Sequence, residues 1–390
     1  MLAAVDLTPT PAESAFRAEV RSWLAANLSP VPDFGDLAAE VAHLRRWQAR
    51  LASGRWVGVA WPAEYGGRGA GPVEHFIVQE ELARAGAPEM VGRIGINLAG
   101  PTLLAHGTPS QKAQWLPRIL GADDLWCQLF SEPGAGSDLA SVATRATPVE
   151  GGWLLNGQKV WTSYAQFADW GVCLARSRPL EEAPKHRGIS YFVVDMHAPG
   201  VEVRPLVQLT GEAEFNEVFL SDVFVPTSQL VGPLHEGWKV ANSTLSHERG
   251  TNPRQLVIHI QLLTELLRLA SATGAWDDRR LRQRLAEAYV EVRLFQLHNL
   301  RSVSRLARGL EPGPEGSALK LYWSEMSKRM HTTVLDVLGP SAPLWKGAAG
   351  NPGDGHWQRS WLYYQGSSIW AGTNEIQRNI IGERVLGLPR

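Results

Sequence analysis

The feature that most constrains this chain is a change in hydrophobic period along its 390 residues. Up to about residue 122, apolar side chains recur every three or four positions, which is typical of amphipathic helices. Between Leu125 and Pro226 they form short runs rich in β-branched and aromatic residues, separated by Gly, Asn, Asp and Pro, which predicts strands. After Gly237 the helical period returns. The pattern therefore predicts helices, then strands, then helices.

These periods predict an α+β multidomain protein: an N-terminal α-helical domain over 1–122, a middle antiparallel β domain over 123–231, and a C-terminal four-helix bundle over 232–390. The expected early helices cover Ala12–Leu28, Leu37–Ala52, Pro72–Ala87, Gly92–His106 and a segment opened by Thr108-Pro109-Ser110. The expected strands cover Trp126–Phe130, Trp153–Leu155, Lys159–Thr162, Gly171–Ala175, Ile189–Val194, Val201–Pro205 and Glu217–Phe224. The expected bundle helices cover Leu256–Ala270, Leu281–Leu310, Ser317–Leu338 and Gln365–Leu386.

Charge and cysteine content narrow the class of protein. With 38 Lys and Arg against 39 Asp and Glu, bulk electrostatics favours neither a nucleic-acid partner nor an anionic membrane. No apolar run approaches the roughly 20 residues of a membrane span, and the first ten residues lack a signal pattern. Cys127 and Cys173 lie in apolar runs, which favours buried free thiols in a reducing compartment. We therefore expect a cytoplasmic protein.

Common catalytic motifs are missing from the sequence. It contains no phosphate-binding GxxxxGK[ST] loop, no GxSxG elbow and no metal-ligand spacing among its eleven His, so no metal site is predicted. Two polar segments remain, QLFSEPGAGSD over 128–138 and NGQKVWTS over 156–163. Their glycines allow close backbone approach, and Trp161 offers a broad planar face. A flat, polar-edged heterocycle such as a flavin suits this pattern, and a surface hairpin turn with a buried Trp suits it about equally well.

Three motifs together make the chain resemble the acyl-CoA dehydrogenase family over essentially its whole length. They are FSEPGAGSD at 130–138, GQKVWTS at 157–163 and GTNEIQRNIIGERVLG at 372–387. The resemblance implies an FAD-dependent oxidoreductase that desaturates an acyl-CoA thioester to the trans-2-enoyl-CoA, as in fatty acid β-oxidation. It further implies an electron-transfer flavoprotein as electron acceptor and a homo-oligomer, a dimer or a homotetramer, or a hetero-oligomer with a homologue.

The resemblance also assigns site residues. Ser137, Ala371 and Gly372 fall at substrate-contacting positions. Trp161 is expected to pack on the flavin ring, and Ser163 to hydrogen-bond near its N5 atom. The positions expected to contact the cofactor are Gln128, Phe130, Ser131, Ser137, Trp161, Thr162, Ser163, Thr373, Asn374 and Glu375.

The catalytic base needs separate treatment. Many family members carry a Glu directly before the C-terminal Gly-Thr, where this chain has Ala371, which accepts no proton. A subset of the family carries the Glu on a bundle helix before an Arg, and here LSHERG provides Glu248 followed by Arg249. We therefore expect Glu248 to remove the α-proton, with Arg249 beside it. Glu375 is a weaker alternative, and Glu248 and Arg249 acting only as a structural ion pair is another.

The chain departs from the family where relatives bind the ADP half of FAD. Residues 270–286 lack the usual Arg-x-Thr-Phe-Gly segment, and 336–345 retain only Gly339 of the later glycines. The arginines at 279, 280, 282 and 284 suit either a pyrophosphate or a solvated helix start. Two further readings thus stay open: a flavin-poor partner subunit of a heteromeric acyl-CoA dehydrogenase, and an oxygen-using oxidase or hydroxylase on the same scaffold.

Overall fold

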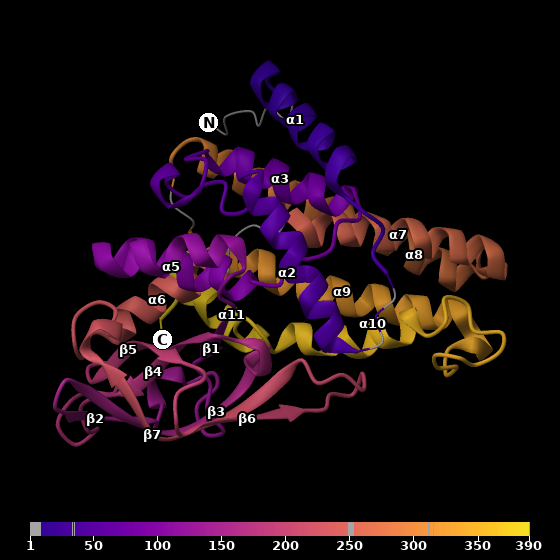
Figure 1. Ribbon diagram of the computed structural model, residues 1–390. Coiled ribbons are helices and arrows are strands. Elements are labelled where there is room, and N and C mark those ends of the chain that lie inside the picture. Colours follow the sequence, from indigo (N-terminus) through magenta and orange to yellow (C-terminus); the bar gives the residue numbers. More distant parts are fainter. Residues whose placement is uncertain are drawn as a thin grey trace. The chain divides into compact units, whose positions relative to one another are not determined.

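The computed structural model describes residues 9–32, 34, 36–248, 253–310, 313–314 and 316–389, without the side chains of 246–248. The chain divides into two compact units that alternate along the sequence (Figure 1). Unit 1 comprises Met1–Leu24, Pro72–Ala87 and Arg249–Arg390, and unit 2 comprises Ala25–Gly71 and Pro88–Glu248. The helix–strand–helix order predicted from the sequence is confirmed. The boundaries near 122 and 232 stay a prediction.

Unit 1 is helical. Its three longest helices, α7, α8 and α9, pack on one another, and α3 packs on α7 and α8 although it comes from the first third of the chain (Figure 1). Buried Leu266, Phe295 and Met330 form part of the shared core. The helices of this unit are α1 (Pro11–Asn27), α3 (Pro72–Arg84), α7 (Pro253–Thr273), α8 (Arg279–Ala307), α9 (Gly316–Leu338), α10 (His356–Gln365) and α11 (Asn374–Ile380).

The last predicted bundle helix differs from the structure. The apolar pattern of Gln365–Leu386 indicated one helix, but α10 ends at Gln365 and α11 begins at Asn374. Between them Ala371 and Gly372 both have left-handed backbone conformations, with φ of 54° and 83°. A left-handed pair cannot continue a right-handed helix, so the chain is interrupted directly before the third motif.

Helix α7 bears on the expectation that no segment of the chain is long and apolar enough to span a membrane. By length and composition alone α7 meets that criterion, with a mean hydropathy of 1.3 over its best window. Core helices of soluble proteins meet the same criterion. Here 39% of that window is buried, and buried residues of α7 such as Leu262 and Leu266 pack in the core of unit 1.

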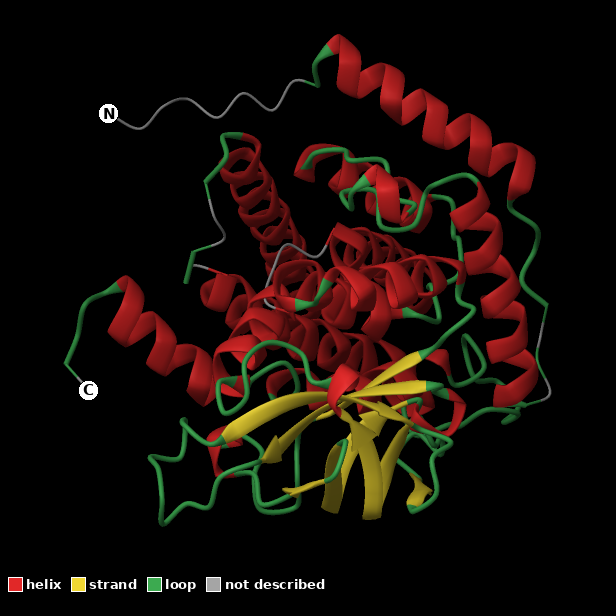
Figure 2. Cartoon of the chain, turned by 60° about the vertical axis from the view of Figure 1, so that its left-hand side comes forward, coloured by secondary structure: helices red, strands yellow, loops and turns green. Residues whose placement is uncertain are grey.

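Unit 2 combines one mixed sheet, whose strands are yellow in Figure 2, with helices α2, α4, α5 and α6. Helix α5 begins directly after Thr108, as predicted, and the structure shows a capping box there: the side chains of Thr108 and Gln111 each accept from the other's backbone N–H. The helices are α2 (Leu37–Ser53), α4 (Gly100–His106), α5 (Pro109–Gly121) and α6 (Gly237–Glu248). The strands are β1 (Trp126–Leu129), β2 (Arg145–Val149), β3 (Gly152–Ser163), β4 (Trp170–Arg176), β5 (Ile189–Asp195), β6 (Val201–Leu206) and β7 (Phe215–Pro226).

The sheet runs in the order β1-β4-β2-β3-β7-β6, and β5 also pairs with β4. Most neighbours are antiparallel as predicted, but β1 pairs with β4 in parallel, and β2 touches β4 in parallel at one residue pair. The two predicted runs Trp153–Leu155 and Lys159–Thr162 belong to the single strand β3, which changes register against β7 twice. Cys127 and Cys173 are buried free thiols in this sheet, as expected.

Candidate functional site

Trp161 stands out in the second motif because its backbone and its exposure are both unusual. Opposite β7, three steps along β3 from Lys159 to Thr162 face two steps from Val218 to Asn216, so one extra residue is inserted as a β-bulge. Trp161 lies in this bulge with φ of 60°, and 62% of its surface is exposed. A bulky residue in the left-handed region is strained by about 1–2 kcal/mol. Such a position indicates a functional constraint.

Strand β7 holds the bulge in place. The buried Asn216 side chain donates to the Thr162 carbonyl at 3.0 Å, and the Tyr164 N–H donates to the Glu214 carbonyl at 2.9 Å. Phe215 meets the Trp161 ring edge to face, with centroids 6.1 Å apart. The Thr162 hydroxyl is buried and has no hydrogen-bond partner among the described residues. The bulge therefore presents an indole face to the surroundings, beside a buried hydroxyl that lacks a partner.

The first motif lies against the same strand. The Val160 N–H donates to the Ser131 carbonyl at 2.9 Å, so the two polar segments singled out in the sequence are joined by a main-chain hydrogen bond. Phe130 is buried against Tyr191, Gln128 and Ser131 are half-buried, and Ser137 is exposed on the glycine-rich loop. The structure thus joins the segment of Ser131 to the segment of Trp161 within unit 2. The alternative of a buried Trp in a surface hairpin does not fit the exposed Trp161.

The third motif forms a separate cluster in unit 1. Gln377 is fully buried, and its side-chain nitrogen donates to the carbonyls of Ala371 and Gly372 at 3.0 and 3.1 Å. Thr373 caps α11 by accepting from the Ile376 N–H. These contacts fix the left-handed pair from inside the unit.

Asn374 and Glu375, both predicted cofactor contacts, have different surroundings. The Asn374 amide is buried, accepts from Lys320 and Ser324, and donates to Glu325 at 2.6 Å. Its partners are therefore all protein side chains. Glu375 is exposed, and a hydrogen bond to its own backbone N–H, together with the Thr373 hydroxyl, lowers the pKa of its carboxyl group. Exposure and a lowered pKa both make Glu375 a poor base near neutral pH.

The expected base falls at the limit of the described structure. Glu248 is the last residue of α6, and its side chain is outside the described part, as is the whole of Arg249. Helix α6 itself is well anchored in unit 2. Its buried Thr244 hydroxyl lies 2.8 Å from that of Thr102 on α4 and 3.3 Å from the Tyr191 hydroxyl on β5. The helix that carries Glu248 is thus fixed one turn before it.

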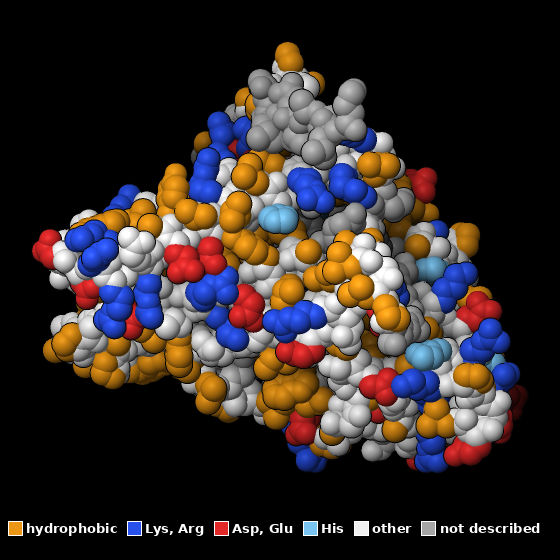
Figure 3. Space-filling model, turned by 180° about the vertical axis from the view of Figure 1, so that it is seen from behind, with side chains coloured by type: hydrophobic (Ala, Val, Ile, Leu, Met, Phe, Trp, Pro, Cys, Tyr) orange, Lys and Arg blue, Asp and Glu red, His pale blue; other side chains and the backbone are white. Residues whose placement is uncertain are grey.

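The arginines at the start of α8 divide into two groups. Arg284 forms an ion pair with Asp336, and Arg282 donates to the Trp276 carbonyl at 2.6 Å. Arg279 and Arg280 are exposed, and Asp278 caps the helix. Both signs of charge are interspersed on the face shown in Figure 3, in keeping with the near-zero net charge.

Sequence reasoning missed three residues that organise these segments. Lys159 and Glu132 form a buried ion pair between the first two motifs, and Gln377 holds the third. All three lie inside the motifs already quoted, but their spacing does not distinguish them from the other polar residues of those motifs.

The fold and the three motifs define an acyl-CoA dehydrogenase, and comparison with family models agrees. The models of the N-terminal, middle and C-terminal acyl-CoA dehydrogenase domains match residues 10–123, 127–223 and 235–386. The chain therefore belongs to the acyl-CoA dehydrogenase family, whose members are FAD-dependent oxidoreductases acting on CH–CH bonds.

Three individual relatives are similar to this chain over nearly its whole length. Acyl-CoA dehydrogenase IpdE1 of Mycobacterium tuberculosis is 42% identical over 389 residues, which cover 96% of this chain and 97% of the relative. A chain of the ChsE4–ChsE5 complex from the same species is 32% identical, with a TM-score of 0.85 and coverage of 99% of this chain and 100% of that chain. The Tcur3481–Tcur3483 steroid ACAD is 30% identical, with the same TM-score and the same coverage.

The described residues of unit 2 fit a flavin. Trp161 supplies an exposed planar face, and the Thr162 hydroxyl is a buried polar group without a protein partner. Ser131 and Ser163 place two more hydroxyl groups on the segments that flank it. These are the groups that a ring system with polar edges requires.

Proposed function

We propose that this protein is an acyl-CoA dehydrogenase that introduces an α,β double bond into an acyl-CoA thioester, giving the trans-2-enoyl-CoA. The single observation that carries the proposal is the strained and exposed Trp161 in the bulge of β3. Its cost in backbone energy is accounted for if the indole face packs on FAD. The proposed cofactor contacts in unit 2 are Gln128, Phe130, Ser131, Ser137, Trp161, Thr162 and Ser163.

Different residues of the protein carry out the separate steps of the reaction. Glu248 takes the α-proton, which requires a carboxylate whose pKa lies near the working pH. The Ala371 N–H donates to the thioester carbonyl oxygen and stabilises the negative charge that develops there. When bound, FAD supplies the two-electron acceptor for the hydride that leaves the β-carbon. An electron-transfer flavoprotein is the proposed final acceptor.

Support for the hydrogen-bond donor comes from the backbone at residue 371. An alanine at φ of 54° turns its peptide away from the helical direction, and Gln377 keeps it there. Because a side-chain carboxylate is missing at this position, the base must come from another helix. Glu248 supplies it in the proposal, while Thr373 and Glu375 contact the cofactor and Gly372 the substrate.

The substrate and the assembly are part of the proposal. Two of the related structures are complexes of two named proteins, and one is described as a steroid ACAD. This supports a heteromer with a homologous chain and a bulky, ring-containing acyl-CoA, ahead of a homotetramer acting on straight-chain fatty acids. The same observation favours the second candidate function, in which this chain is the flavin-poor subunit of such a heteromer.

The deciding experiment is anaerobic titration of the purified protein with acyl-CoA thioesters of straight-chain, branched and steroid-side-chain type. Bleaching of the flavin absorption by at least one thioester is expected, and the best substrate shows the steepest titration. A stable but colourless protein that gains flavin and activity only with a homologous chain would establish the flavin-poor role. Rapid reoxidation of the flavin by air would instead indicate an oxidase.

The base is tested by Glu248→Gln, which keeps the size of the side chain and removes its proton affinity. Turnover is expected to fall about 10²–10⁴-fold while flavin content stays unchanged. Glu265→Gln serves as the matched control, since this exposed carboxylate of α7 lies outside the proposed site, and little change is expected. Near-normal turnover of Glu248→Gln would remove Glu248 from the mechanism.

A further inference from the structure

A buried lysine lies at the root of the glycine-rich loop of the first motif. Lys159 is fully buried, and its ammonium group donates to the Phe130 carbonyl at 3.2 Å, the Leu174 carbonyl at 2.7 Å and Glu132 Oε1 at 2.7 Å. The three N–H bonds of an ammonium group are therefore all used. One side chain of β3 thus joins the end of β1, the start of the loop and strand β4.

Its partner Glu132 closes the loop from the other side. Glu132 Oε2 accepts from the Ala143 N–H at 2.6 Å, and Oε1 also accepts from the Thr144 N–H at 3.0 Å. Burial by itself would raise the pKa of Glu132, but the Lys159 ammonium and these N–H donors hold it below its usual value. The carboxylate therefore binds the first residues of the loop to the segment in which the loop ends.

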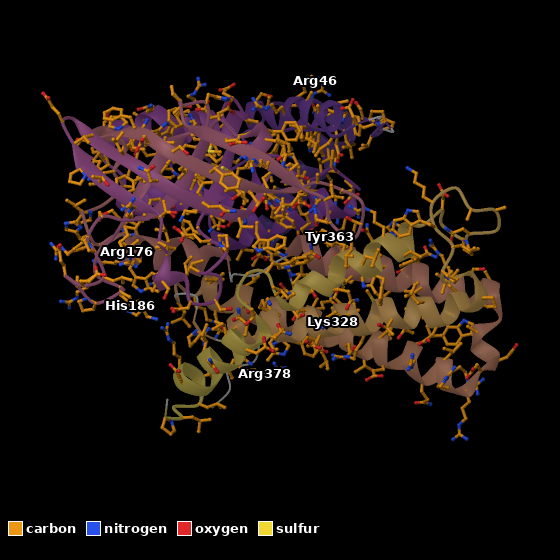
Figure 4. All side chains as sticks on the ribbon, turned by 90° about the horizontal axis from the view of Figure 1, so that it is seen from below. Arg46, Arg176, His186, Lys328, Tyr363 and Arg378 are labelled. Carbon is orange, nitrogen blue, oxygen red and sulfur yellow. The ribbon has the colours of Figure 1, made fainter. Side chains whose placement is uncertain are left out.

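A second buried cation fixes the far side of the same loop. Arg176 on β4, labelled in Figure 4, donates from its guanidinium to the Val142 carbonyl at 3.0 Å and the Ala140 carbonyl at 2.7 Å. Its backbone N–H donates to the Thr144 carbonyl at 2.7 Å. Both ends of the loop are thus held by charged side chains that contact main-chain atoms.

The residues that hold the loop, Lys159 and Val160, lead directly into the bulge that contains Trp161. Lys159 holds the loop through its side chain, Val160 holds it through its N–H on Ser131, and Trp161 follows as the next residue. An ion pair at the loop tip offers a contrast, since Asp138 and Lys185 meet at 2.8 Å but are exposed. Exposed pairs contribute little to stability, whereas removing one partner of a buried pair leaves an uncompensated charge.

We propose that the Lys159–Glu132 ion pair positions the flavin-binding surface of unit 2, by fixing the Ser131 loop and the Trp161 bulge to each other. Neither residue is a catalytic residue, because both are buried and their hydrogen-bonding groups are occupied by one another and by main-chain atoms. The inference rests on the proposed function, since it assigns the flavin to Trp161. It also adds two residues to that site which neither motif spacing nor the expected contacts indicated.

The test uses the full-length protein with four changes. Lys159→Met and Glu132→Gln each remove one partner, and the double variant removes both charges. Glu132→Asp keeps the charge and shortens its reach, so it replaces any variant that does not fold. Lys185→Met is the matched control, because it removes an ion pair from the same loop at its exposed tip.

The readouts are the FAD dissociation constant, the visible absorption spectrum of the bound flavin and the melting temperature. Lys159→Met is expected to weaken FAD binding about 10- to 100-fold, the range found when a residue that orients a metal ligand is removed and used here by analogy. In the double variant the melting temperature is expected to recover towards that of the wild type, because no unpaired charge stays buried. FAD affinity and the altered spectrum are expected not to recover.

An FAD affinity that follows the melting temperature through all variants would overturn the inference, because the pair would then only stabilise the fold. Hydrogen exchange of residues 131–144 and 159–163 without added FAD separates this failure from failure of the proposed function. If the wild-type protein binds no flavin but Lys159→Met still loosens both segments together, the flavin proposal fails and the positioning role stands. Unchanged exchange in these segments would overturn the positioning role itself.

Discussion

The two units hold a strained residue of the candidate site by different chemistry. In unit 2, Trp161 is supported by a sheet in which the charged Lys159 and Glu132 are buried. In unit 1, Ala371 is held directly by the neutral amide of Gln377, although the adjacent Asn374 network contains the charged Lys320 and Glu325. The contacts that hold the strained segment thus involve an ion pair in unit 2 and a neutral amide in unit 1.

Backbone hydrogen bonding explains the difference. At the ends of β1 and in the loop that follows, carbonyls such as that of Phe130 are available, and an ammonium group can be surrounded by them. Helices use their own carbonyls, so a buried side chain between helices can only share one that is already bonded or meet another side chain. In unit 1 the neutral imidazoles of His259 and His331 share helix carbonyls in this way: each donates from Nδ1 to the backbone carbonyl four residues earlier.

The histidine network extends across three helices. His259 Nε2 lies 2.8 Å from the Ser327 hydroxyl, and His331 Nε2 lies 2.7 Å from that of Ser360. Tyr364, next to the labelled Tyr363 of α10 in Figure 4, stacks on His331 with ring centroids 4.5 Å apart. Because a carbonyl only accepts, each Nδ1 carries the proton and each Nε2 accepts from the serine.

Of the predicted changes, acidification is expected to have the largest effect on the free energy of unfolding. Burial lowers the pKa of His259 to about 3 and that of His331 to about 4. The unfolded chain, with His pKa near 6.5, binds more protons below that pH, so the free energy of unfolding falls by up to about 1.4 kcal/mol per pH unit for each imidazole. The contribution of Glu132 is lost only as the pH falls through its lowered pKa, below 4.5. Between pH 6.5 and 5 the loss should therefore come from histidines whose pKa is lowered by burial, with His259 and His331 in unit 1 and also His106 and His235 in unit 2.

Chemical denaturation at pH 7, 6 and 5 measures this loss. His259→Gln is expected to flatten the pH dependence, and the exposed His197→Gln is the control that should leave it unchanged. If the His259→Gln and wild-type proteins lose stability equally on acidification, the histidine network is not the acid-sensitive part.

Removing the indole tests the site of unit 2. Trp161→Ala should weaken FAD binding by about 1–3 kcal/mol, which is roughly 5- to 150-fold, because a stacking surface is lost. Its melting temperature should stay close to that of the wild type, since most of the ring is exposed. Fluorescence titration with FAD measures the affinity, and Trp345→Ala, an exposed tryptophan of unit 1, is the control. Equal affinities in the two variants would contradict the stacking role.

Removing the amide tests the site of unit 1. Gln377→Met leaves the carbonyls of Ala371 and Gly372 without their donor and should lower the free energy of unfolding by about 1–2 kcal/mol. If the peptide at 371 stabilises the thioester oxygen, kcat should fall more than KM rises. Gln365→Met, which removes one half-buried amide on the neighbouring helix, is the control for stability alone. A change in KM with unaltered kcat would limit Gln377 to substrate binding.

The smallest expected effect concerns backbone strain. Ala371→Gly relieves a left-handed conformation worth about 1–2 kcal/mol and costs about 0.5–1 kcal/mol in chain entropy, so a net gain in stability of about 1 kcal/mol or less is expected. Ala342→Gly, at a right-handed position with φ of −55°, should instead lower stability. Thermal denaturation of both variants measures the difference, and a loss of stability in both would mean that residue 371 is not strained.

Helices were largely predictable because their signals are local. The helical period predicts α2 to within one residue, and the Thr108-Pro109-Ser110 segment predicts where α5 begins. Two predictions were wrong. The single strand β3 was divided into two runs because its polar middle, Asn156-Gly157-Gln158, interrupts the apolar alternation. The segment from Gln365 was joined into one helix because a left-handed pair leaves no trace in the hydrophobic period. In both places the local pattern was misleading.

Of the candidate site, the sequence by itself determined the chemical groups: Trp161, the hydroxyls of both motifs, the missing carboxylate at residue 371 and the order of the three regions. Side-chain identity and local spacing suffice for these features. Only the tertiary structure decided that Trp161 is exposed and left-handed, that Asn374 faces protein partners, and that Lys159 and Glu132 are buried together. The physical reason is that burial, strain and ion pairing depend on contacts between residues far apart in sequence, here 27 positions for Lys159 and Glu132.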